Sequence, residues 1–534
     1  MKKSFLLAAM VAAGVFSAIA DMPAPIELDD AFIYALSPNG KYAVSENSLG
    51  IKIYDLASDK VDEFIDESGM TEVACGIGNC VSDNGIVVGS SDGVTPQYCK
   101  DGEWIDLPVG QAVNTSLCNA ITPDGSRICG SLGLNALSFD GDALMQVPCI
   151  WNATANGYSE PVVLPYPEKD FSGRVPIYVT ATDMSADGKI IIGQVMNATG
   201  MISYPLIYKE AADGTWTYEI VDEKSLVPEG VVFNEFPGDG PRCPQPEEYM
   251  TAEEEAEYAD AYQNWIDSGY NSDLYPEVTD FMDEEEIAEY EADLAKYQEE
   301  YSVWEEKYYT WFEALEKCMA NIPLFVFNSM KMSPDGKYFG GTVQIEEPGE
   351  GWWDSNVYMN VWIGDTENYT YTKYDQEPDL NLTYLANEGV GLASTSVWTS
   401  SQSWVLKNST SEAMYDWMAS KSSEYADYMM ENMTFGIEQY DWDTGEFTYK
   451  EEFMSGRAVS TPSLDVMALT VQNLWDYMTD AEAFVFNLAQ GSSVKGVEVV
   501  KDGETVVYDL QGRKLNNVVA PGIYIVNGEK KVVR

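Results

Sequence analysis

The sequence contains no histidine in its 534 residues. This absence excludes Ser–His–Asp and Cys–His catalysis, histidine-based acid–base chemistry and nearly all common zinc and iron sites. No two cysteines have the Cys-x-x-Cys spacing of a metal cluster either. An enzyme built on this chain would therefore use carboxylates, tyrosine, lysine or a Ser–Lys pair.

Basic residues are scarce. The chain has 30 lysines and arginines against 88 aspartates and glutamates, which gives a formal net charge of −58. Such an excess of negative charge repels a phosphate backbone, so we expect no nucleic-acid partner. Cations, basic proteins and neutral glycans are the partners that this charge favours. Apolar residues make up 45% and aromatics 12%, a composition typical of a globular protein.

The apolar run at the N-terminus is too short to cross a bilayer. After the basic start Met1–Lys3, residues 5–16 are apolar, whereas a spanning helix needs roughly 20 such residues. A basic start, a short apolar run and small residues at its end are typical of a signal peptide, here residues 1–20. We predict cleavage between Ala20 and Asp21 and export of the remaining chain. No later segment is apolar enough to span a membrane, so we do not expect an integral membrane protein.

One turn motif recurs along the chain. It reads Ser or Thr, any residue, Asp or Asn, and Gly in all five of its copies. Asn-Gly and Asp-Gly join two strands in a tight hairpin because they tolerate the positive φ of such turns. A glycine that closes the second strand indicates a close backbone approach or a bulge. The copies begin at Ser37, Ser82, Thr122, Ser185 and Ser333, and the closing glycines are Gly89, Gly130, Gly193 and Gly340.

Two further strand patterns follow each hairpin. A variable loop leads to a strand that ends in an aromatic residue, as at Trp151 and Tyr208, and a fourth strand comes after it. Four antiparallel strands in each unit of about 40 to 60 residues predict a mainly β fold, a β-propeller of four-stranded blades.

These repeats resemble the HAF-type extracellular repeats and, more loosely, WD40-like propellers. The resemblance covers five copies between about residues 31 and 375, and two degenerate copies without the Asp-Gly turn follow at 391–406 and 457–488. We therefore predict about seven blades, with six or eight as the alternatives. Four blades are assigned to residues 21–242 and the others to 323–490. The motif indicates architecture and says almost nothing about a ligand.

An acidic insertion interrupts the repeats over residues 243–322. Residues 247–321 carry 24 acidic residues against three lysines, and apolar residues recur at 3–4 spacing from Ile287 to Ile322. This spacing predicts a long helix, and a similar pattern predicts a shorter one over about 246–267. We expect the two to form a helical hairpin within the chain; an intermolecular coiled coil is the alternative.

All eight cysteines lie in the predicted exported part, and their even number permits disulfides. Free buried thiols are the alternative. Cys243 and Cys318 bracket the acidic insertion, so they are the candidate pair for a disulfide that would clamp the base of the hairpin.

Residues 491–534 have the pattern of a small β appendage, with short strands, glycine turns and a basic end. The stretches "YDLQGRKL" from Tyr508 and "PGIYIVNGEKKVVR" from Pro521 resemble the type A C-terminal sorting domain of type IX secretion. The Asn-Pro strand that begins longer family members is missing. The resemblance implies the type IX secretion machinery as a partner. It also implies a protein that is secreted or held on the outer cell surface after passage through the periplasm.

Candidate ligand-binding residues are few. Tryptophans near a carboxylate can stack on sugars, although propeller strands also bury such rings. The candidates are Trp352, Trp353, Asp354, Trp398 and Trp404.

One stretch has spacing similar to a calcium loop. It contains Asp441, Asp443 and Glu446, but the full twelve-residue pattern is absent, so an ordinary acidic turn is favoured. Calcium at the Asp-Gly turns is disfavoured for a different reason, because Asn replaces Asp in two of them. Calcium is the one cofactor that the sequence leaves open.

Two classes of function remain. The first is an exported, non-catalytic propeller that binds a protein or a glycan, with the acidic hairpin as a projecting arm. The alternative is a carboxylate-based polysaccharide hydrolase or lyase; a glycosidase needs two carboxylates about 5 to 9.5 Å apart. Because histidine is missing and no catalytic signature is present, we favour the binding protein and assign no catalytic residue.

Overall fold

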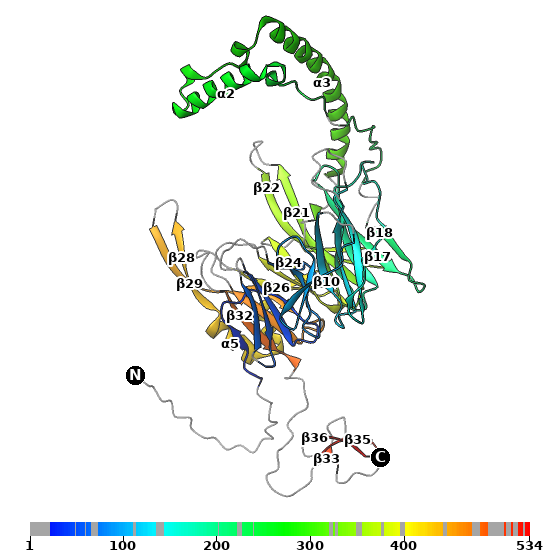
Figure 1. Cartoon of the computed structure of the whole chain (residues 1–534). Coiled ribbons are helices and arrows are strands. Elements are labelled where there is room, and N and C mark those ends of the chain that lie inside the picture. Colours follow the sequence, from blue (N-terminus) through cyan, green and yellow to red (C-terminus); the bar gives the residue numbers. More distant parts are fainter. Residues whose placement is uncertain are drawn as a thin grey trace. The chain divides into compact units, whose positions relative to one another are not determined.

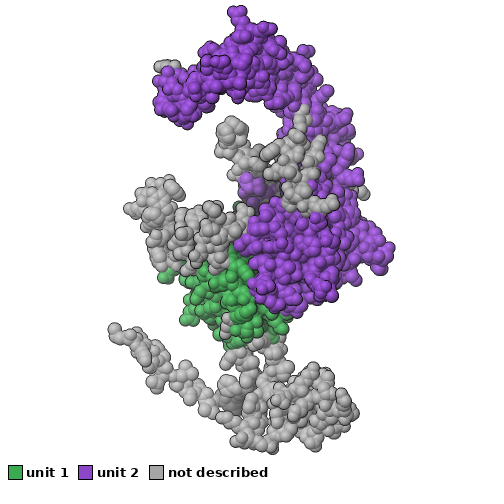
Figure 2. Space-filling model, in the orientation of Figure 1, with its two compact units in different colours: residues 1–67, 376–534 green, residues 68–375 purple. Residues whose placement is uncertain are grey.

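A computed structural model shows a mainly β protein whose chain forms two compact units (Figures 1 and 2). Unit 1 comprises residues 1–67 and 376–534, and unit 2 comprises residues 68–375. The structure describes residues 22–47, 50–58, 60–65, 73–110, 114–134, 144–200, 202–221, 227–238, 240–319, 324–325, 329–348, 355–374, 379–395, 401–441, 446–471, 481–489, 507–508, 514–515, 522–526 and 529–533.

Unit 2 contains four of the predicted blades, each an antiparallel meander, counting the strands that the structure describes. A single parallel pair, Gln146 with Tyr178, joins the second and third of them into one continuous sheet. The strands of the first two blades are β6 (Ala74–Cys75), β7 (Val87–Ser90), β8 (Gln97–Lys100), β9 (Glu103–Asp106), and β10 (Asn114–Ile121), β11 (Arg127–Gly133), β12 (Gln146–Thr154), β14 (Val162–Val163), with β13 (Gly157–Tyr158) beside β12. Those of the next two are β15 (Tyr178–Met184), β16 (Ile190–Met196), β17 (Ser203–Glu210), β18 (Trp216–Ile220), and β20 (Lys331–Met332), β21 (Tyr338–Pro348), β22 (Ser355–Asp365), β23 (Tyr371–Tyr374), with β19 (Leu324–Phe325) on β21.

Unit 1 contains three further four-stranded sheets of this kind among its described residues. Their strands are β2 (Ile33–Leu36), β3 (Tyr42–Asn47), β4 (Gly50–Asp55), β5 (Lys60–Ile65); β24 (Leu380–Leu385), β25 (Gly391–Thr395), β26 (Ser403–Lys407), β27 (Thr410–Ala413); and β30 (Arg457–Ser460), β31 (Val466–Val471), β32 (Glu482–Asn487), β1 (Ile26–Leu28). The described strands therefore make seven meanders in chain order, which confirms the predicted β-propeller of four-stranded blades.

The last blade is completed from the other end of the chain. Strand β1 pairs antiparallel with β32, so that Ile26 lies opposite Val485. This N-terminal strand takes the outermost place in the C-terminal blade. Segments from near both ends of the chain are thereby joined in one sheet. Sequence patterning does not reveal this pairing, because β1 is three residues long and its partner is distant.

The recurring turns pack on one another from blade to blade within each unit. A Cβ atom on Gly188 would lie 3.0 Å from Thr122 in the preceding blade, and one on Gly336 would lie 3.1 Å from Ser185. Gly188 also has a φ of +66°, which L side chains rarely adopt. The motif glycine is thus required twice, for the turn itself and for the close approach of the neighbouring turn.

A bulge in the first strand of several blades turns a polar side chain toward the next blade. The register shifts between Cys118 and Ala120 in β10, and the amide of Asn119 donates to the carbonyl oxygen of Ala181 at 2.8 Å. In unit 1 a bulge in β24 places the Thr383 hydroxyl 2.5 Å from the carbonyl oxygen of Ala458. Hydrogen bonds of this type link adjacent blades along their first strands.

The acidic insertion forms an arm that projects from the sheets of unit 2 (Figure 1). It contains the 3₁₀ turn η1 (Pro246–Tyr249), helix α2 (Ala252–Asp267), the 3₁₀ turns η2 (Ser272–Leu274) and η3 (Val278–Phe281), and helix α3 (Glu284–Met319). At about 1.5 Å per residue, α3 is about 54 Å long. Both predicted helices are present, and they are joined through η2 and η3.

The base of α3 is built into the core of unit 2. Trp311, Leu315 and Cys318 are fully buried and belong to one apolar cluster with Tyr204 and Tyr208 of β17. This packing explains the 3–4 spacing of apolar residues in the C-terminal half of the helix.

An extended segment before the arm, residues 231–238 and 240–245, covers the middle of α3. The indole N–H of Trp304 donates to the carbonyl oxygen of Gly238 at 2.8 Å, and Gly240 lies against the same ring. The thiol of Cys243 contacts the Tyr297 side chain. Residue 297 precedes Cys318 by about six helical turns, or about 30 Å. The predicted Cys243–Cys318 disulfide is therefore wrong for this structure, in which both cysteines are free thiols.

Unit 1 carries additions that the repeat pattern does not predict. Helices α4 (Met414–Lys421) and α5 (Ser423–Asn432) and the hairpin of β28 (Thr434–Asp441) and β29 (Glu446–Phe453) lie between its second and third blades in the chain. Four short strands near the C-terminus form the predicted small sheet, β33 (Val507–Tyr508), β34 (Lys514–Leu515), β35 (Gly522–Val526) and β36 (Glu529–Val533). Among the described helices, none has the length and hydropathy needed to cross a membrane.

Candidate functional site

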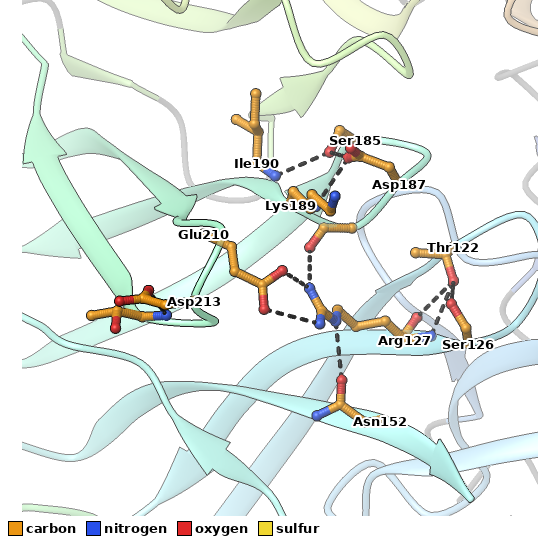
Figure 3. Close-up of polar contacts among 12 residues, drawn as sticks. Thr122, Ser126, Arg127, Asn152, Ser185, Asp187, Lys189, Ile190, Glu210 and Asp213 are labelled. Carbon is orange, nitrogen blue, oxygen red and sulfur yellow. Dashed lines mark hydrogen bonds and ion pairs between the residues drawn. The ribbon is translucent and has the colours of Figure 1, made fainter.

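The Asp-Gly turns use their polar groups internally (Figure 3). The Ser185 hydroxyl donates to Asp187 Oδ1 at 2.7 Å, and the Ile190 amide donates to the same hydroxyl at 3.0 Å. The Lys189 amide donates to Asp187 Oδ1 at 3.1 Å. Within the described residues, no group of three or more acidic or thiol side chains could hold a metal ion. The turns are therefore built as hairpin and interblade contacts.

Figure 3 also shows a polar cluster between two blades of unit 2. The Arg127 guanidinium makes two hydrogen bonds to the Glu210 carboxylate, at 2.9 and 3.3 Å, and donates to the Gly188 carbonyl oxygen at 2.7 Å. Its Nε donates to Asn152 at 3.1 Å. Because all of these partners belong to the protein and the ion pair is mostly buried, the cluster joins blades and is not a ligand site.

Asp183 is the buried carboxylate that most resembles a catalytic group. Desolvation by burial raises its pKa, although the nearby Lys331 ammonium and three backbone amides oppose the rise. Its oxygens accept hydrogen bonds from the amides of Asn79 at 3.0 Å, Met184 at 2.9 Å and Met332 at 2.9 Å. A shifted pKa often marks an active site. Here burial causes the shift, and the carboxylate oxygens are used in hydrogen bonds that link three segments of unit 2.

A cleft in unit 1 is the strongest candidate for a ligand site. Its volume is about 800 Å³, which lies in the range of small-molecule pockets. It lies among strands β26 and β27, helices α4 and α5, and the turn between β30 and β31. The residues that line it are Met22, Val390, Val405, Lys407, Asn408, Thr410, Glu412, Trp417, Lys421, Ser422, Ser423, Glu424, Ser463, Leu464, Asp465 and Leu488.

The floor of this cleft is apolar. Val390, Val405 and Trp417 are buried there, and helix α4 packs onto β26 and β27, the third and fourth strands of the blade. The Lys421 ammonium lies 5.4 Å from the centre of the Trp417 ring, close enough for a cation–π contact. The aromatic ring on the floor of the cleft thus has a cation from the rim beside it.

The rim of the cleft is polar and carries both signs of charge. Glu412, Glu424 and Asp465 are exposed, as are Lys407 and Lys421. Hydroxyl and amide groups of Thr410, Ser422, Ser463 and Asn408 lie between them. Because the charges nearly cancel, the rim favours a neutral ligand that is rich in hydrogen-bonding groups.

The N-terminal segment forms part of one wall. The Met22 amide donates to the Glu424 carboxylate at 3.2 Å. The Tyr425 hydroxyl lies 2.9 Å from the carbonyl oxygen of Pro23 and 3.0 Å from that of Asn487, and burial raises the Tyr425 pKa. This phenol therefore holds the start of the chain against the end of β32.

Of the predicted site residues that the structure describes, none is among those that line this cleft. Trp404 lies in β26 next to Val405, and because side chains alternate along a strand, its ring faces away from the cleft. Its indole N–H is buried without a partner among the described atoms. Asp441 and Glu446 lie opposite each other at the end of the β28–β29 hairpin. Trp352, Trp353, Asp354, Trp398, Asp443 and the cleavage site Ala20–Asp21 lie outside the described residues.

Sequence reasoning missed Trp417 and Lys421 because it followed strand patterns through this region. The spacing of Met414, Trp417, Met418 and Met429, all of which are buried, is the helical signal that could have located them.

No family model matches this sequence. No curated protein matches it either. Among solved structures, it is similar to hydrazine synthase from Kuenenia stuttgartiensis, with 11% identity and a TM-score of 0.38 over 90% of this chain and 99% of that one. TolB from Acinetobacter baumannii gives 7% identity and a TM-score of 0.24 over 83% and 78% of the two chains. A putative TolB from Agrobacterium tumefaciens gives 11% and 0.26 over 74% and 89%. Values this low assign neither a family nor an activity.

Proposed function

We propose that this protein is an exported, non-catalytic β-propeller that binds a neutral glycan in the cleft of unit 1. The observation that carries the proposal is the pairing of an apolar floor, which contains Trp417, with a rim of hydroxyl, amide and charged groups. Sugars have an apolar face that packs on aromatic rings and an edge of hydroxyls that needs many donors and acceptors. The cleft offers both kinds of contact.

Binding is favoured over hydrolysis by the surroundings of the cleft carboxylates. A glycosidase needs one carboxylic acid that stays protonated near neutral pH, which requires an apolar environment. Glu412, Glu424 and Asp465 are exposed to water instead. Their positions suit hydrogen bonding to hydroxyl groups.

A glycan array followed by calorimetry on each binding glycan tests this proposal. We expect Trp417→Leu and Lys421→Ala to weaken binding by about tenfold each, because the first removes the aromatic face and the second a charged donor, each a contact of about 1–1.5 kcal/mol. Lys60→Ala is the matched control, since Lys60 is an exposed lysine in the same unit that lies outside the cleft. Binding that is unchanged in both cleft variants would refute the assignment. Hydrolysis of a bound glycan that is lost in Glu412→Gln or Glu424→Gln would support the hydrolase instead.

Export is the second part of the proposal. The signal-peptide pattern of residues 1–20 and the resemblance of residues 491–534 to a type IX sorting domain support passage through the periplasm to the outside or the cell surface. Fractionation of cells that carry the type IX machinery tests this. The full chain is expected in the medium or on the surface, and a chain that ends at residue 490 is expected in the periplasm. Equal secretion of the full chain and the truncated chain would show that the tail has no sorting role.

A further inference from the structure

The far end of the arm carries an exposed aromatic patch. Four residues there are more than a third exposed: Tyr262 at 37%, Tyr270 at 65%, Leu274 at 45% and Tyr275 at 49%. The three tyrosines lie around Trp265, whose ring lies 5.0 Å from the rings of both Tyr270 and Tyr275. We call these five residues the distal aromatic patch. Large aromatic side chains gathered on an exposed surface usually mark an interaction site.

The patch is held in a fixed shape by local contacts. Thr251 and Glu254 form a reciprocal capping box at the start of α2. The Tyr262 ring contacts Trp265 at 5.1 Å, and Tyr258 contacts Phe281 at 5.6 Å, so α2 packs on the chain that follows it. These contacts orient the rings before any partner binds, which reduces the entropy lost on binding.

The patch is also fixed to the rest of unit 2. The Tyr249 hydroxyl donates to Asp293 of α3 at 2.9 Å, and the ring of Tyr249 lies 5.6 Å from that of Tyr290. Helix α3 in turn is anchored through Trp311 in the core of unit 2. A long helix with a buried base thus carries the aromatic rings away from the sheets (Figure 1).

Charge decides which partner suits this surface. Residues 251–283 contain ten acidic residues and no lysine or arginine. A second copy of the chain, with its net charge of −58, would be repelled, as would an anionic lipid surface or a nucleic acid. Arginine and lysine side chains, by contrast, can stack on aromatic faces while carboxylates pair with their charge.

The protein itself shows this mode of contact in unit 2. The Arg174 guanidinium lies 3.5 Å from the centre of the Phe236 ring and 5.7 Å from that of Trp311. Arg127 lies 5.5 Å from the Trp216 ring. Both arginines come from the same chain, whereas residues 251–283 supply no cation of their own. We propose that the distal aromatic patch is a docking surface for an arginine- or lysine-rich segment of another protein.

Fluorescence anisotropy with a labelled peptide of alternating arginine and glycine tests the proposal on the full-length protein. We expect binding at physiological salt that weakens as salt rises, because ion pairs contribute. The double variant Tyr270→Ala/Tyr275→Ala should weaken binding by about tenfold or more, and Tyr270→Phe/Tyr275→Phe should retain it, because the aromatic faces remain. Tyr309→Ala is the matched control: Tyr309 is 57% exposed and lies on α3 outside the patch, so affinity should change less than twofold.

Two results would overturn the proposal. Equal binding by wild type and the double alanine variant would mean that the peptide is attracted by overall negative charge alone. Binding of a neutral glycan at the patch, insensitive to salt and lost in the same variant, would assign a different ligand. Circular dichroism of each variant checks that α2 and α3 remain helical. If the alanine pair does not fold, the single variants Tyr270→Ala and Tyr275→Ala provide the test, and each is expected to weaken binding.

Discussion

Replacing Trp311 with alanine tests whether the arm is an integral part of unit 2. Trp311 is completely buried and its ring lies 5.0 Å from that of Phe236, 5.9 Å from that of Phe233 and 6.4 Å from that of Tyr308. A buried aromatic side chain removes about 150–250 Å² from water, which is worth about 4–6 kcal/mol at about 25 cal/mol per Å². Measured costs of Trp→Ala in protein cores are about 3–5 kcal/mol. We therefore expect Trp311→Ala to lower the free energy of unfolding of unit 2 by about 4 kcal/mol.

Urea unfolding followed by far-ultraviolet circular dichroism measures this loss without depending on tryptophan fluorescence. The matched control is Tyr309→Ala, because Tyr309 lies on the same helix but is 57% exposed. An exposed substitution of this kind should change stability by less than about 0.5 kcal/mol. Limited proteolysis adds a local reading, since residues 231–245 should become easier to cleave when the base of α3 loosens. A loss below about 1 kcal/mol for Trp311→Ala would refute the packing of α3 into the core.

Three further outcomes are expected. Arg127→Ala should lower the free energy of unfolding in urea by about 2–3 kcal/mol, because it leaves the mostly buried Glu210 carboxylate and the Gly188 carbonyl without their donor. A decrease no larger than that caused by replacing an exposed arginine would contradict the interblade role. Gly193→Ala should cost about 2–3 kcal/mol by thermal melting, because its Cβ would lie 2.4 Å from the Thr180 carbonyl oxygen, and a neutral effect would disprove this close approach. Burial raises the pKa of Asp92, but hydrogen bonds from the Thr95 and Val94 amides and the Thr95 and Ser90 hydroxyls outweigh it and lower the pKa to about 2. Its stabilising effect is therefore complete above about pH 4 and lost as the pH falls toward 2, so Asp92→Asn should flatten the acid side of a stability–pH curve.

The blades were predictable where the turn chemistry is regular. Five turns carry Asn-Gly or Asp-Gly, and the hairpins they predict are present. The sixth turn has Glu388 before Gly389, and the seventh places Leu464 at a φ of 62°, which leucine rarely adopts. These two turns lack the sequence signal, although the Asn387 amide donates to the Pro462 carbonyl oxygen at 3.1 Å, as the Ala186 amide does to Pro334 at 2.8 Å. The hydrogen bond between neighbouring turns is therefore present even where the turn residues differ from the motif.

The cleft was not predictable, because no single stretch of sequence carries it. Its walls come from the N-terminal segment near Met22, the helices around Trp417 and the turn at Ser463, which are far apart in the chain. Pattern reading ranks residues by local composition, so it selected tryptophans beside carboxylates. It does not identify residues that form a site only when segments far apart in the chain come together in the fold.

The pairing of β1 with β32 has a consequence for the order in which the protein folds. Ile26 is among the first residues of the described chain to be synthesised, whereas Val485 is among the last, and the whole of unit 2 lies between them. Contacts over such separations form slowly, because a long loop must close before they stabilise anything. During synthesis, β1 therefore has no partner strand until the chain is nearly complete. A chain truncated before residue 482 would leave β1 without a partner, so only a chain that extends through β32 can complete the third blade of unit 1.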